Sequence, residues 1–477
     1  MGFAQYTDYD GLGLAQLVKN KDVTPAELLE EAITRAEKHN GKLNAIVYKA
    51  YDQARAAAKG QLPDGPFKGV PFLIKDLGTE VAGMPRSDGT LFNKNEVDTF
   101  DALLVQRYKA AGVNIFGKTN TPEFGITGTT ESNRLKPCRN PWNTEHITGG
   151  SSGGSASAVA AGILPLANAS DGLGSIRIPA ACCGLVGMKV TQYRVPMGKE
   201  HDYGLGHGYG VNHVVSRTVR DSAAMLDAVD APEIDTPYPA PPKARPYILE
   251  VTAPPGKLRI AFSEETPNNR PIHPEVRAAL RETAKLLESL GHHVEERGMG
   301  INYRKLYAAS RDVLGANFAQ SMRERVKEMG REPEQHELEP LTWRNWKGGE
   351  HIPGHATMRG WQTLKAMTRE VFHFFTTCDV YLTPVLGTPV PKVGFIDPVN
   401  LAPREVDERQ AQTFPFTPPF NITQQPSLSL PLAQSSDGLP IGMMLTARWA
   451  DEATLYRLAG QLEQAKPWIH RKPQIWN

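Results

Sequence analysis

Unbroken apolar runs mark the first candidate strands of this chain. The segments 69–76 (GVPFLIKD) and 113–120 (VNIFGKTN) are apolar at successive positions, which is typical of strands buried on both faces. A helix-like stretch at 102–111 lies between them. This order predicts a strand–helix–strand unit of a parallel sheet, in which active sites commonly lie at the strand ends. Lys75, at the end of the first run, is therefore expected inside the protein.

Apolar positions recur with helical spacing in three other regions. Residues 24–27 (TPAE) match a capped helix start and precede a repeating apolar face. A second helix is predicted from Pro274 to a stop at Gly291. Residues 302–376 are helical in pattern and rich in charge and tryptophan. We expect them to form a lid or a wall of the substrate site.

Apolar runs return in the second half of the chain. The segments 258–262, 378–391 and 425–432 are predicted to be strands, and we expect them to share one sheet with the early strands. The apolar stretch 156–169 is shorter than the roughly 18 to 20 residues that cross a bilayer. We interpret it as a buried helix. Together these elements predict an α/β fold.

Composition narrows the classes of function. The 53 Lys and Arg residues nearly balance 52 Asp and Glu, and the net charge of +1 provides no strong field to attract nucleic acid or an anionic membrane. The first residues carry no secretion or lipidation signal. Four cysteines without paired spacing argue against a disulfide framework and a zinc cluster. We expect a cytoplasmic protein that acts on small neutral substrates.

Two glycine-flanked serines carry the most informative pattern. Ser151 lies in GGSSGGS, and Ser175 follows in DGLGSIRIP, 175 − 151 = 24 residues later. Glycines at 172 and 174 allow consecutive N–H groups to converge on one oxygen, as an oxyanion requires. We therefore predict that Ser175 is the nucleophile.

Lys75 is the candidate base for this serine. A lysine must be neutral to accept a proton, and burial at a strand end would lower its pKa from about 10.4 toward about 7 to 8. Ser151 can relay the proton, because a hydroxyl both donates and accepts. The three residues predict acyl-transfer chemistry.

The same segments resemble the amidase signature family. The resemblance covers nearly the whole chain and rests on both serine segments and the lysine of GVPFLIKD. Supporting segments are GKTNTPEFG (117–125), NPWN (140–143), GLVGMKVT (184–191), SRTVRD (216–221), PFNITQQPSLSLP (419–431) and GLPIGMML (438–445). The resemblance implies one α/β amidase domain over residues 1–477, with a large mixed β-sheet flanked on both faces by α-helices. The signature core would cover about 60–230, with a variable helical insertion at about 302–376.

The resemblance also implies roles for individual residues. The catalytic triad would be Ser175, Ser151 after a cis peptide bond from Gly150, and Lys75. The oxyanion hole would be the N–H groups of Gly172, Leu173, Gly174 and Ser175. Ser152 would support the serines, and an ion pair of Asp171 with Arg177 would brace the oxyanion loop. Substrate binding is assigned to Gly149, Gly150, Arg311 and Gln424, with no metal and no organic cofactor.

Two residues depart from the family pattern and bear on selectivity. Leu173 stands in a loop that is often all glycine, and Gln424 stands where the family's NxxGxP pattern has glycine. The C-terminal segments resemble 6-aminohexanoate cyclic-dimer hydrolases and related urethanases most. Arg311 replaces a smaller residue at a pocket position of the nylon-oligomer enzymes, so that substrate is not copied directly.

The expected activity is hydrolysis of small amides, nylon-oligomer-like or aryl, and of carbamates. The alternatives are a urethanase and the amidase subunit of a tRNA-dependent amidotransferase. The near-neutral charge argues mildly against an RNA role. We expect a monomer or homodimer whose only partner is the small-molecule substrate.

Three unrelated functions remain as alternatives. GGSSG also matches the nucleophile elbow of α/β-hydrolases, which would make Ser151 the nucleophile, but a polar loop stands where a strand should precede it. A metal amidohydrolase could use His201, His207 and His213, or His292 and His293, although no metal-binding spacing occurs. The stretch from Gly112, GVNIFGKT, matches a phosphate-binding loop formally, but its middle reads as a strand.

Overall fold

An eight-stranded mixed sheet forms the centre of the protein in a computed structural model that describes residues 3, 5–93, 97–196, 209–230 and 239–476. The β10–β9 and β9–β11 pairs are parallel, and the remaining pairs are antiparallel. The mixed sheet that the resemblance implied is confirmed. Its strands, in spatial order, are β10 (His293–Glu296), β9 (Arg259–Phe262), β11 (Val380–Pro384), β13 (Pro440–Ala447), β12 (Ser427–Gln434), β7 (Val186–Lys189), β8 (Val211–Ser216) and β6 (Leu166–Asp171).

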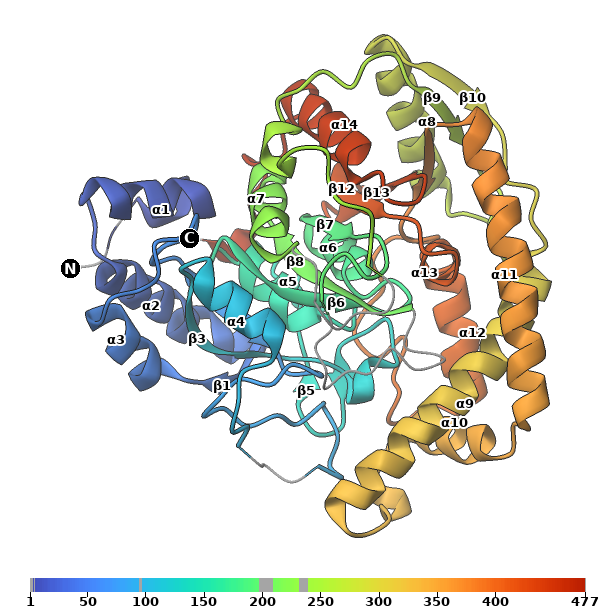
Figure 1. Ribbon diagram of the computed structural model, residues 1–477, viewed down its shortest axis with the longest axis horizontal. Helices are drawn as coiled ribbons and strands as arrows, with labels where there is room; N and C mark the ends of the chain where they lie inside the picture. The colour runs from blue at the N-terminus through green and yellow to red at the C-terminus, as the bar shows by residue number, and fades with distance from the viewer. Residues whose placement is uncertain (1–2, 4, 94–96, 197–208, 231–238, 477) are drawn as a thin grey trace.

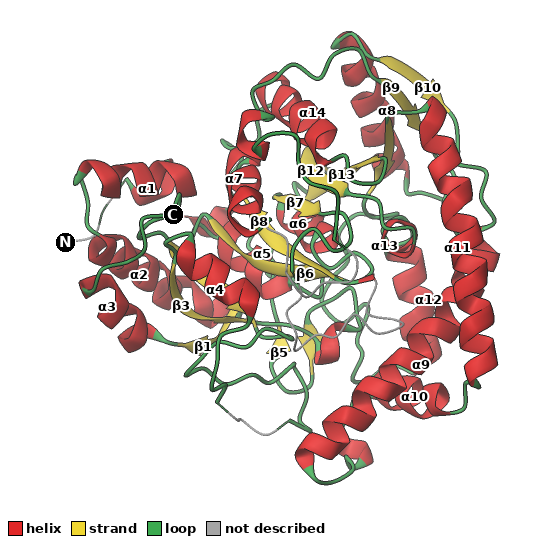
Figure 2. Cartoon of the chain, in the orientation of Figure 1, coloured by secondary structure: helices red, strands yellow, loops and turns green. Residues whose placement is uncertain are grey.

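Helices surround this sheet (Figure 1 and Figure 2). Both termini of the chain lie on the side of the N-terminal helices, where Arg35 of α2 donates to the Trp476 carbonyl at 2.8 Å. None of the described helices is long and apolar enough to span a bilayer. The helices are α1 (Gly11–Asn20), α2 (Pro25–Leu43), α3 (Tyr51–Lys59), α4 (Leu103–Ala110), α5 (Gly153–Ala160), α6 (Arg177–Cys183), α7 (Val219–Val229), α8 (Pro274–Ser289), α9 (Tyr303–Met329), α10 (Pro340–Glu350), α11 (Gly354–Thr377), α12 (Pro403–Thr413), α13 (Pro418–Ile422) and α14 (Glu452–Ala465).

Helices cover both faces of the sheet, and a glycine and a polar contact show how they pack there. On one face α6 packs closely on β7, where a Cβ at Gly187 would lie 2.6 Å from Ala180 Cβ. On the other face lie α7 and α14 (Figure 1). These two helices are joined where Ser222 Oγ and Tyr456 OH approach to 3.0 Å. The predicted arrangement of helices on both faces is therefore confirmed.

A separate three-stranded sheet carries the catalytic lysine candidate. Its order is β1 (Ile46–Lys49), β3 (Asn114–Thr119) and β2 (Pro71–Lys75), with β2 parallel to β3 as the sequence predicted. The expectation that these early strands share the main sheet is wrong. Strand β2 lies beside the edge strand β6, but Lys75 N–H meets the Asn168 side-chain oxygen, at 3.1 Å, instead of a backbone carbonyl.

The apolar stretch 156–169 is not one helix. Helix α5 ends at Ala160, Gly162 turns the chain with a φ of +68°, and β6 begins at Leu166. The second part forms a strand because its backbone pairs with β8, from Leu166 opposite Ser216 to Asp171 opposite Val211. Tertiary pairing therefore overrides what an unbroken apolar run can specify.

The predicted start of α2 is confirmed by its contacts. The Thr24 hydroxyl accepts from Glu27 N–H at 3.2 Å, and Glu27 Oε2 accepts from Thr24 N–H at 2.8 Å, which completes a capping box. The predicted helix and strand around Gly291 are also present, as α8 and β10.

Residues 302–376 are helical, as predicted, and form α9, α10 and α11. Figure 1 shows α11 along one outer edge of the molecule, with α9 and α10 beneath it. A second, smaller apolar cluster holds α9 and α10 against the loop after β2. Its buried members are Phe92, Ala319, Met322, Met329, Leu338 and Trp346.

Candidate active site

Lys75, the last residue of β2, lies in full burial between two serine hydroxyls. Its Nζ is 2.6 Å from Ser151 Oγ and 2.9 Å from Ser170 Oγ. A neutral amine has two N–H donors and one lone pair. Ser170 can accept one N–H, which leaves the lone pair available to the Ser151 proton.

The pKa of Lys75 is low for a lysine. Burial lowers it from 10.5 to about 7, and the negative charge of Asp171 opposes part of that change. The amine is therefore largely neutral at slightly alkaline pH, which is the state that a general base requires. The sequence-based prediction of a desolvated lysine is confirmed.

The Ser151 segment is held by backbone contacts before α5. The Gly150–Ser151 peptide bond is cis, as the resemblance implied. Gly149 has a φ of +70°, and Gly150 leaves no room for a side chain, because a Cβ there would lie 2.6 Å from the Thr129 carbonyl carbon. These two glycines therefore set the path of the chain into Ser151.

Ser152 connects this segment to the end of β6 and to Ser175. Its hydroxyl donates to the Ser170 carbonyl at 3.1 Å and accepts from Ser170 N–H at 3.2 Å. Its N–H donates to the Ser175 carbonyl at 3.3 Å. Ser152 thus has the supporting place that was predicted for it.

Ser175 is half-buried, whereas Ser151 is only 2% exposed. A substrate carbonyl can therefore reach Ser175 more readily than Ser151. Within the described part of the chain no direct hydrogen bond joins the two hydroxyls, and their segments meet through Ser152 N–H and the Ser175 carbonyl.

A buried ion pair braces the loop that carries Ser175. Arg177 donates to both carboxylate oxygens of Asp171, each at 3.0 Å, and to the Thr417 carbonyl at 3.0 Å. Asn421 Nδ2 donates to Asp171 Oδ1 at 2.8 Å, and its Oδ1 accepts from Arg177. Burial alone would raise the pKa of Asp171, but Arg177 and Asn421 hold it well below its usual range. The predicted brace is confirmed.

One predicted oxyanion donor is wrong. Gly174 N–H donates to Asp171 Oδ1 at 2.7 Å, so this carboxylate takes the N–H that the sequence had assigned to the substrate. The N–H groups of Gly172, Leu173 and Ser175 have no acceptor among the described residues. These three remain the candidates for binding an oxyanion.

Gly174 instead sets the shape of the loop. Its φ is +137°, and a Cβ there would overlap the Thr417 hydroxyl and lie 2.7 Å from Ile178 Cδ1. The Thr417 hydroxyl also donates to the Leu173 carbonyl at 2.7 Å. The Leu173 side chain is 38% exposed, so it extends away from the core beside Ser175.

Three residues of the site were missed at the sequence level. Ser170 directly precedes Asp171, Asn421 begins the NxxGxP pattern that was recognised, and Thr417 lies four residues before Asn421. The pattern was a usable signal for Asn421. Ser170 and Thr417 had none, because single serines and threonines occur throughout the chain.

The two predicted selectivity residues lie in different settings. Gln424 is partly exposed and adopts a φ of +73°, so the residue at the family's glycine position keeps the glycine-type backbone. Arg311 lies on α9 with its side chain 81% exposed, 3.9 Å from Asp312. No described contact joins Arg311 to either serine.

The alternative functions receive no support from the described residues. His213 is buried in β8 with Nε2 3.1 Å from Ser222 Oγ, and burial lowers its pKa to about 3. His201 and His207 lie outside the described residues. The GVNIFGKT stretch is mainly strand β3, with Lys118 buried and paired with Asp98 at 3.3 Å, so it does not form an open phosphate loop. The residues that precede Ser151 form no strand, so the nucleophile elbow is absent there.

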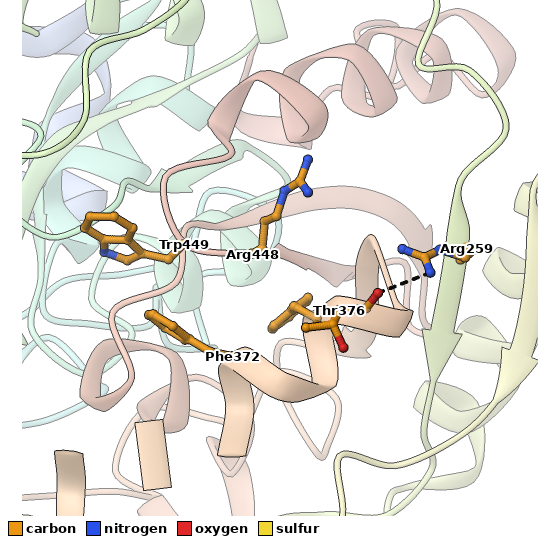
Figure 3. Close-up of a pocket in the computed structure, with 6 residues that line it drawn as sticks. Arg259, Phe372, Thr376, Arg448 and Trp449 are labelled. Carbon is orange, nitrogen blue, oxygen red and sulfur yellow. Dashed lines mark hydrogen bonds between the residues drawn. The ribbon is translucent and has the colours of Figure 1, made fainter. Parts of the chain in front are cut away.

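A cavity of about 320 Å³ lies away from these residues, at the C-terminal end of α11 (Figure 3). Its lining is Arg259, Phe372, Phe375, Thr376, Arg448 and Trp449. Both arginines are already paired with carboxylates, at 2.7 Å for Arg259 and 2.9 Å for Arg448. None of the predicted site residues lines it.

Comparison with known proteins places this chain in a family. The family model described as Amidase matches residues 27–456. The AmiC protein of Mycobacterium tuberculosis is 39% identical over 97% of this chain and 95% of its own length. The 6-aminohexanoate-cyclic-dimer hydrolase of Paenarthrobacter ureafaciens is 34% identical over 98% of this chain and 97% of its own length.

Solved structures give the same result. A 6-aminohexanoate cyclic dimer hydrolase complexed with substrate has a TM-score of 0.94 at 33% identity, over 99% of this chain and 100% of that chain. A bacterial aryl acylamidase of the amidase signature family has a TM-score of 0.87 at 26% identity, over 96% of each chain. The sequence, the fold and these relatives agree, and the chain belongs to the amidase signature family of amidohydrolases.

Proposed function

We propose that this protein is a serine amidohydrolase that cleaves the C–N bond of small amides through an acyl-enzyme at Ser175. Ser151 relays the proton and Lys75 receives it. The observation that carries the proposal is the fully buried Lys75 amine 2.6 Å from Ser151 Oγ, because a dry amine beside a hydroxyl is poised to accept its proton.

In the first step Ser175 Oγ attacks the substrate carbonyl carbon and forms a C–O bond. Its proton passes to Ser151 Oγ, whose own proton passes to Lys75 Nζ. The carbonyl electrons move to the oxygen, which the N–H groups of Gly172, Leu173 and Ser175 stabilise. The C–N bond then breaks, and the amine leaves with the proton returned from Lys75 through Ser151. Water releases the acid by the same steps.

The proposed substrates are small, uncharged amides of the nylon-oligomer or aryl type. Support comes from the cyclic-dimer hydrolase and aryl acylamidase relatives. The near-neutral net charge of +1 also fits an uncharged substrate. Carbamates have the same carbonyl and a similar leaving group, so they belong in the same test.

The test is a mass-spectrometric product screen with the purified chain. The substrates are aryl amides, linear and cyclic 6-aminohexanoate oligomers, dipeptide amides and aryl carbamates. We expect hydrolysis of at least one amide, with the acyl group trapped on the peptide that contains Ser175. The Ser175→Ala variant should show neither product nor adduct.

Two variants separate this mechanism from its alternatives. Ser151→Ala should retain the fold and lose activity by about 10²- to 10⁴-fold, because the proton relay is removed. Hydrolysis by Ser175→Ala at the wild-type rate would contradict the proposal. A rate for carbamates far above that for every amide would instead identify a urethanase.

A further inference from the structure

Asp88 lies in a tight turn between β2 and α4 and is buried. Its backbone has a φ of +50°, which asparagine and aspartate tolerate better than most residues. Its Oδ1 accepts from Gly78 N–H at 3.0 Å, three residues after Lys75. Its own carbonyl accepts from Phe124 N–H at 2.8 Å. Asp88 therefore connects the loop after the catalytic lysine to a second loop.

This second loop contacts the relay serine. A Cβ at Gly125 would lie 3.1 Å from Ser151 Oγ and 2.6 Å from Leu77 Cδ2. The two loops also meet at the neighbouring Gly89, where a Cβ would lie 2.7 Å from the Pro122 carbonyl oxygen. The loop after Lys75 and the loop that contacts Ser151 are thus packed together around the Asp88 turn.

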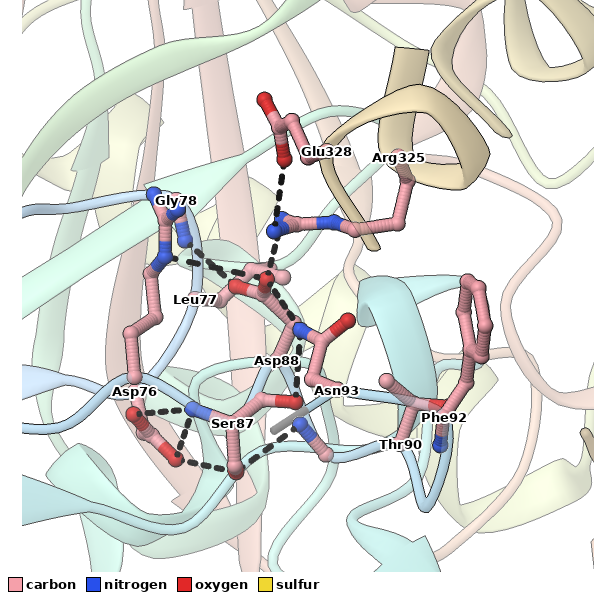
Figure 4. A network of polar contacts seen from close by, with 12 residues as sticks. Asp76, Leu77, Gly78, Ser87, Asp88, Thr90, Phe92, Asn93, Arg325 and Glu328 are labelled. Carbon is pink, nitrogen blue, oxygen red and sulfur yellow. Dashed lines mark hydrogen bonds and ion pairs between the residues drawn. The ribbon is translucent and has the colours of Figure 1, made fainter. Parts of the chain in front are cut away.

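An arginine of the variable helical region holds Asp88 (Figure 4). Arg325 of α9 donates to Asp88 Oδ2 at 2.9 Å, and Asn93 Nδ2 donates to the same oxygen at 2.9 Å. Arg86 Nε lies 3.8 Å from that oxygen. Arg325 also pairs with Glu328 at 3.0 Å. Asp88 is buried and Arg325 is only 22% exposed, so their interaction is weakly screened by solvent.

Apolar contacts hold α9 at the same place. Phe318 of α9 meets Phe124 edge to face, with ring centroids 6.1 Å apart. Phe92, four residues after Asp88, belongs to the apolar cluster that α9 and α10 share. The Asp88 turn is therefore the point at which α9 meets both loops of the Lys75–Ser151 pair.

We propose that Asp88 is a positioning residue, and that its pairing with Arg325 couples the docking of α9 to the geometry of Lys75 and Ser151. The inference rests on the proposed function, because it assigns the loops a role in that proton transfer. Neither residue touches the reacting atoms. Their effect is to keep both loops closed on the lysine and to exclude water from it.

Loosening the turn has a directional consequence for the pH profile. Water admitted to Lys75 restores part of its solvation, so its pKa moves up from about 7 toward 10.5. Among the described residues, Asp171 of β6 acts electrostatically on Lys75, and the adjacent Asp76 pairs with Lys118 of β3 at 4.0 Å. None of these is changed in the variants below.

The test compares the pH dependence of kcat/KM for the wild type, Arg325→Met, Asp88→Asn and the double variant, on a neutral amide. We expect the low-pH limb to move up by about half a unit or more in each single variant. In the double variant the limb should move no further than in the single variant with the larger shift, because both substitutions break the same contact.

Asp88→Asn distinguishes positioning from simple electrostatics. Loss of its negative charge would by itself lower the pKa of Lys75, whereas loss of positioning raises it. Arg323→Met, two residues earlier on α9 and paired with Glu350 at 3.4 Å on the surface, is the matched control and should keep the wild-type limb. Arg325→Lys keeps the cation, so its low-pH limb should lie close to that of the wild type.

A limb that stays in place in folded Arg325→Met and Asp88→Asn, or that moves down in Asp88→Asn, overturns the inference alone. Wild-type hydrolysis that survives Ser175→Ala contradicts the proposed function instead, and the inference with it. Circular dichroism and thermal melting of each variant establish that the folded protein is compared.

Discussion

At the scale of single residues, the protein combines a buried lysine amine with a more accessible serine hydroxyl. Lys75 is fully buried beside Ser151, while Ser175 is half-buried at the start of α6. Burial depresses the pKa of the amine to about 7. Desolvation therefore makes the Lys75 ammonium lose its proton near neutral pH, and the neutral amine can then act as a base.

Removing the Lys75 amine should abolish this function and stabilise the fold. We expect Lys75→Met to lose about 10²- to 10⁴-fold in kcat/KM. Wild-type activity should rise with pH through about pH 7 as Lys75 loses its proton. The measurements are steady-state kinetics and urea denaturation across pH.

The stability effect has a defined sign. Between the folded pKa of about 7 and the unfolded value of 10.5, only the unfolded state holds the proton, so wild-type stability rises with pH across that window. The gain in the free energy of unfolding from Lys75→Met is therefore largest below about pH 7 and vanishes near pH 10.5. Lys189→Met is the matched control. Burial also lowers its pKa to about 7, and it donates to the Val190 carbonyl at 3.0 Å, so its removal should stabilise similarly and spare far more activity.

The backbone of the oxyanion loop gives a second prediction at this scale. Gly174→Ala should lower kcat by about 10²-fold or more, because the new Cβ overlaps Thr417 and displaces the loop donors. Gly348→Ala on α10 is the control, since nothing lies within 4 Å of a Cβ there. Equal activities for the two variants would show that the loop geometry is not critical.

The sequence predicted most of the contacts of the site at this scale. Lys75, Ser151, Asp171 and Arg177 lie where the motifs implied, because their spacing fixes them relative to strand ends and tight turns. Gly174 was misassigned because a carboxylate competes for its N–H. That competition depends on three-dimensional geometry, which the spacing does not record.

At the scale of elements, the joint between α10 and the loop at Glu123 contains two buried carboxyl groups. Glu339 N–H donates to Glu123 Oε2 at 2.8 Å, and Glu339 Oε1 accepts from Asn133 N–H at 2.9 Å. Burial, and then the Glu123 charge, raise the pKa of Glu339 to about 8. This joint attaches the helical region 302–376 to the segment beside Ser151.

Glu339→Gln should stabilise the protein in a pH-dependent way. The folded state keeps a proton on Glu339 up to about pH 8, whereas the unfolded carboxyl loses it near 4.5. Wild-type stability from this group therefore falls as pH rises across that window. The gain in the variant should grow from pH 5 to pH 9 in denaturant titrations. A gain that is constant with pH would mean that Glu339 is ionised throughout.

Element types and the parallel β2–β3 pair were predictable, but the sheet to which these strands belong was not. Capping residues and helical spacing located α2 and α8. The run 156–169 was misread because an apolar stretch without alternation fits a buried helix and a buried strand equally. The early strands were placed in the main sheet because periodicity carries no information about which strands pair.

At the scale of the whole molecule, the site is assembled from segments that are far apart in the chain. Asp171 and Arg177 meet Asn421, 250 residues from Asp171. Arg325 reaches back 237 residues to Asp88. The site depends on contacts between segments from both halves of the chain. This explains why the resemblance to the family extends over nearly the full chain.

This chain is expected to act alone. Purified protein should hydrolyse its amide with no added subunit, RNA or ATP, because the proposed base and the proposed nucleophile both lie within this chain. Assays with and without a cell extract of the source would test this. Activity that appears only with a copurified partner would favour the amidotransferase-subunit alternative.

The most direct measurement of the central claim is the pH dependence of serine modification by a fluorophosphonate probe, read by peptide mass spectrometry. The account predicts a single adduct on Ser175, at a rate that rises through about pH 7 and collapses in Lys75→Met. An adduct on Ser151 or another serine, or a rate that is indifferent to Lys75, would contradict it.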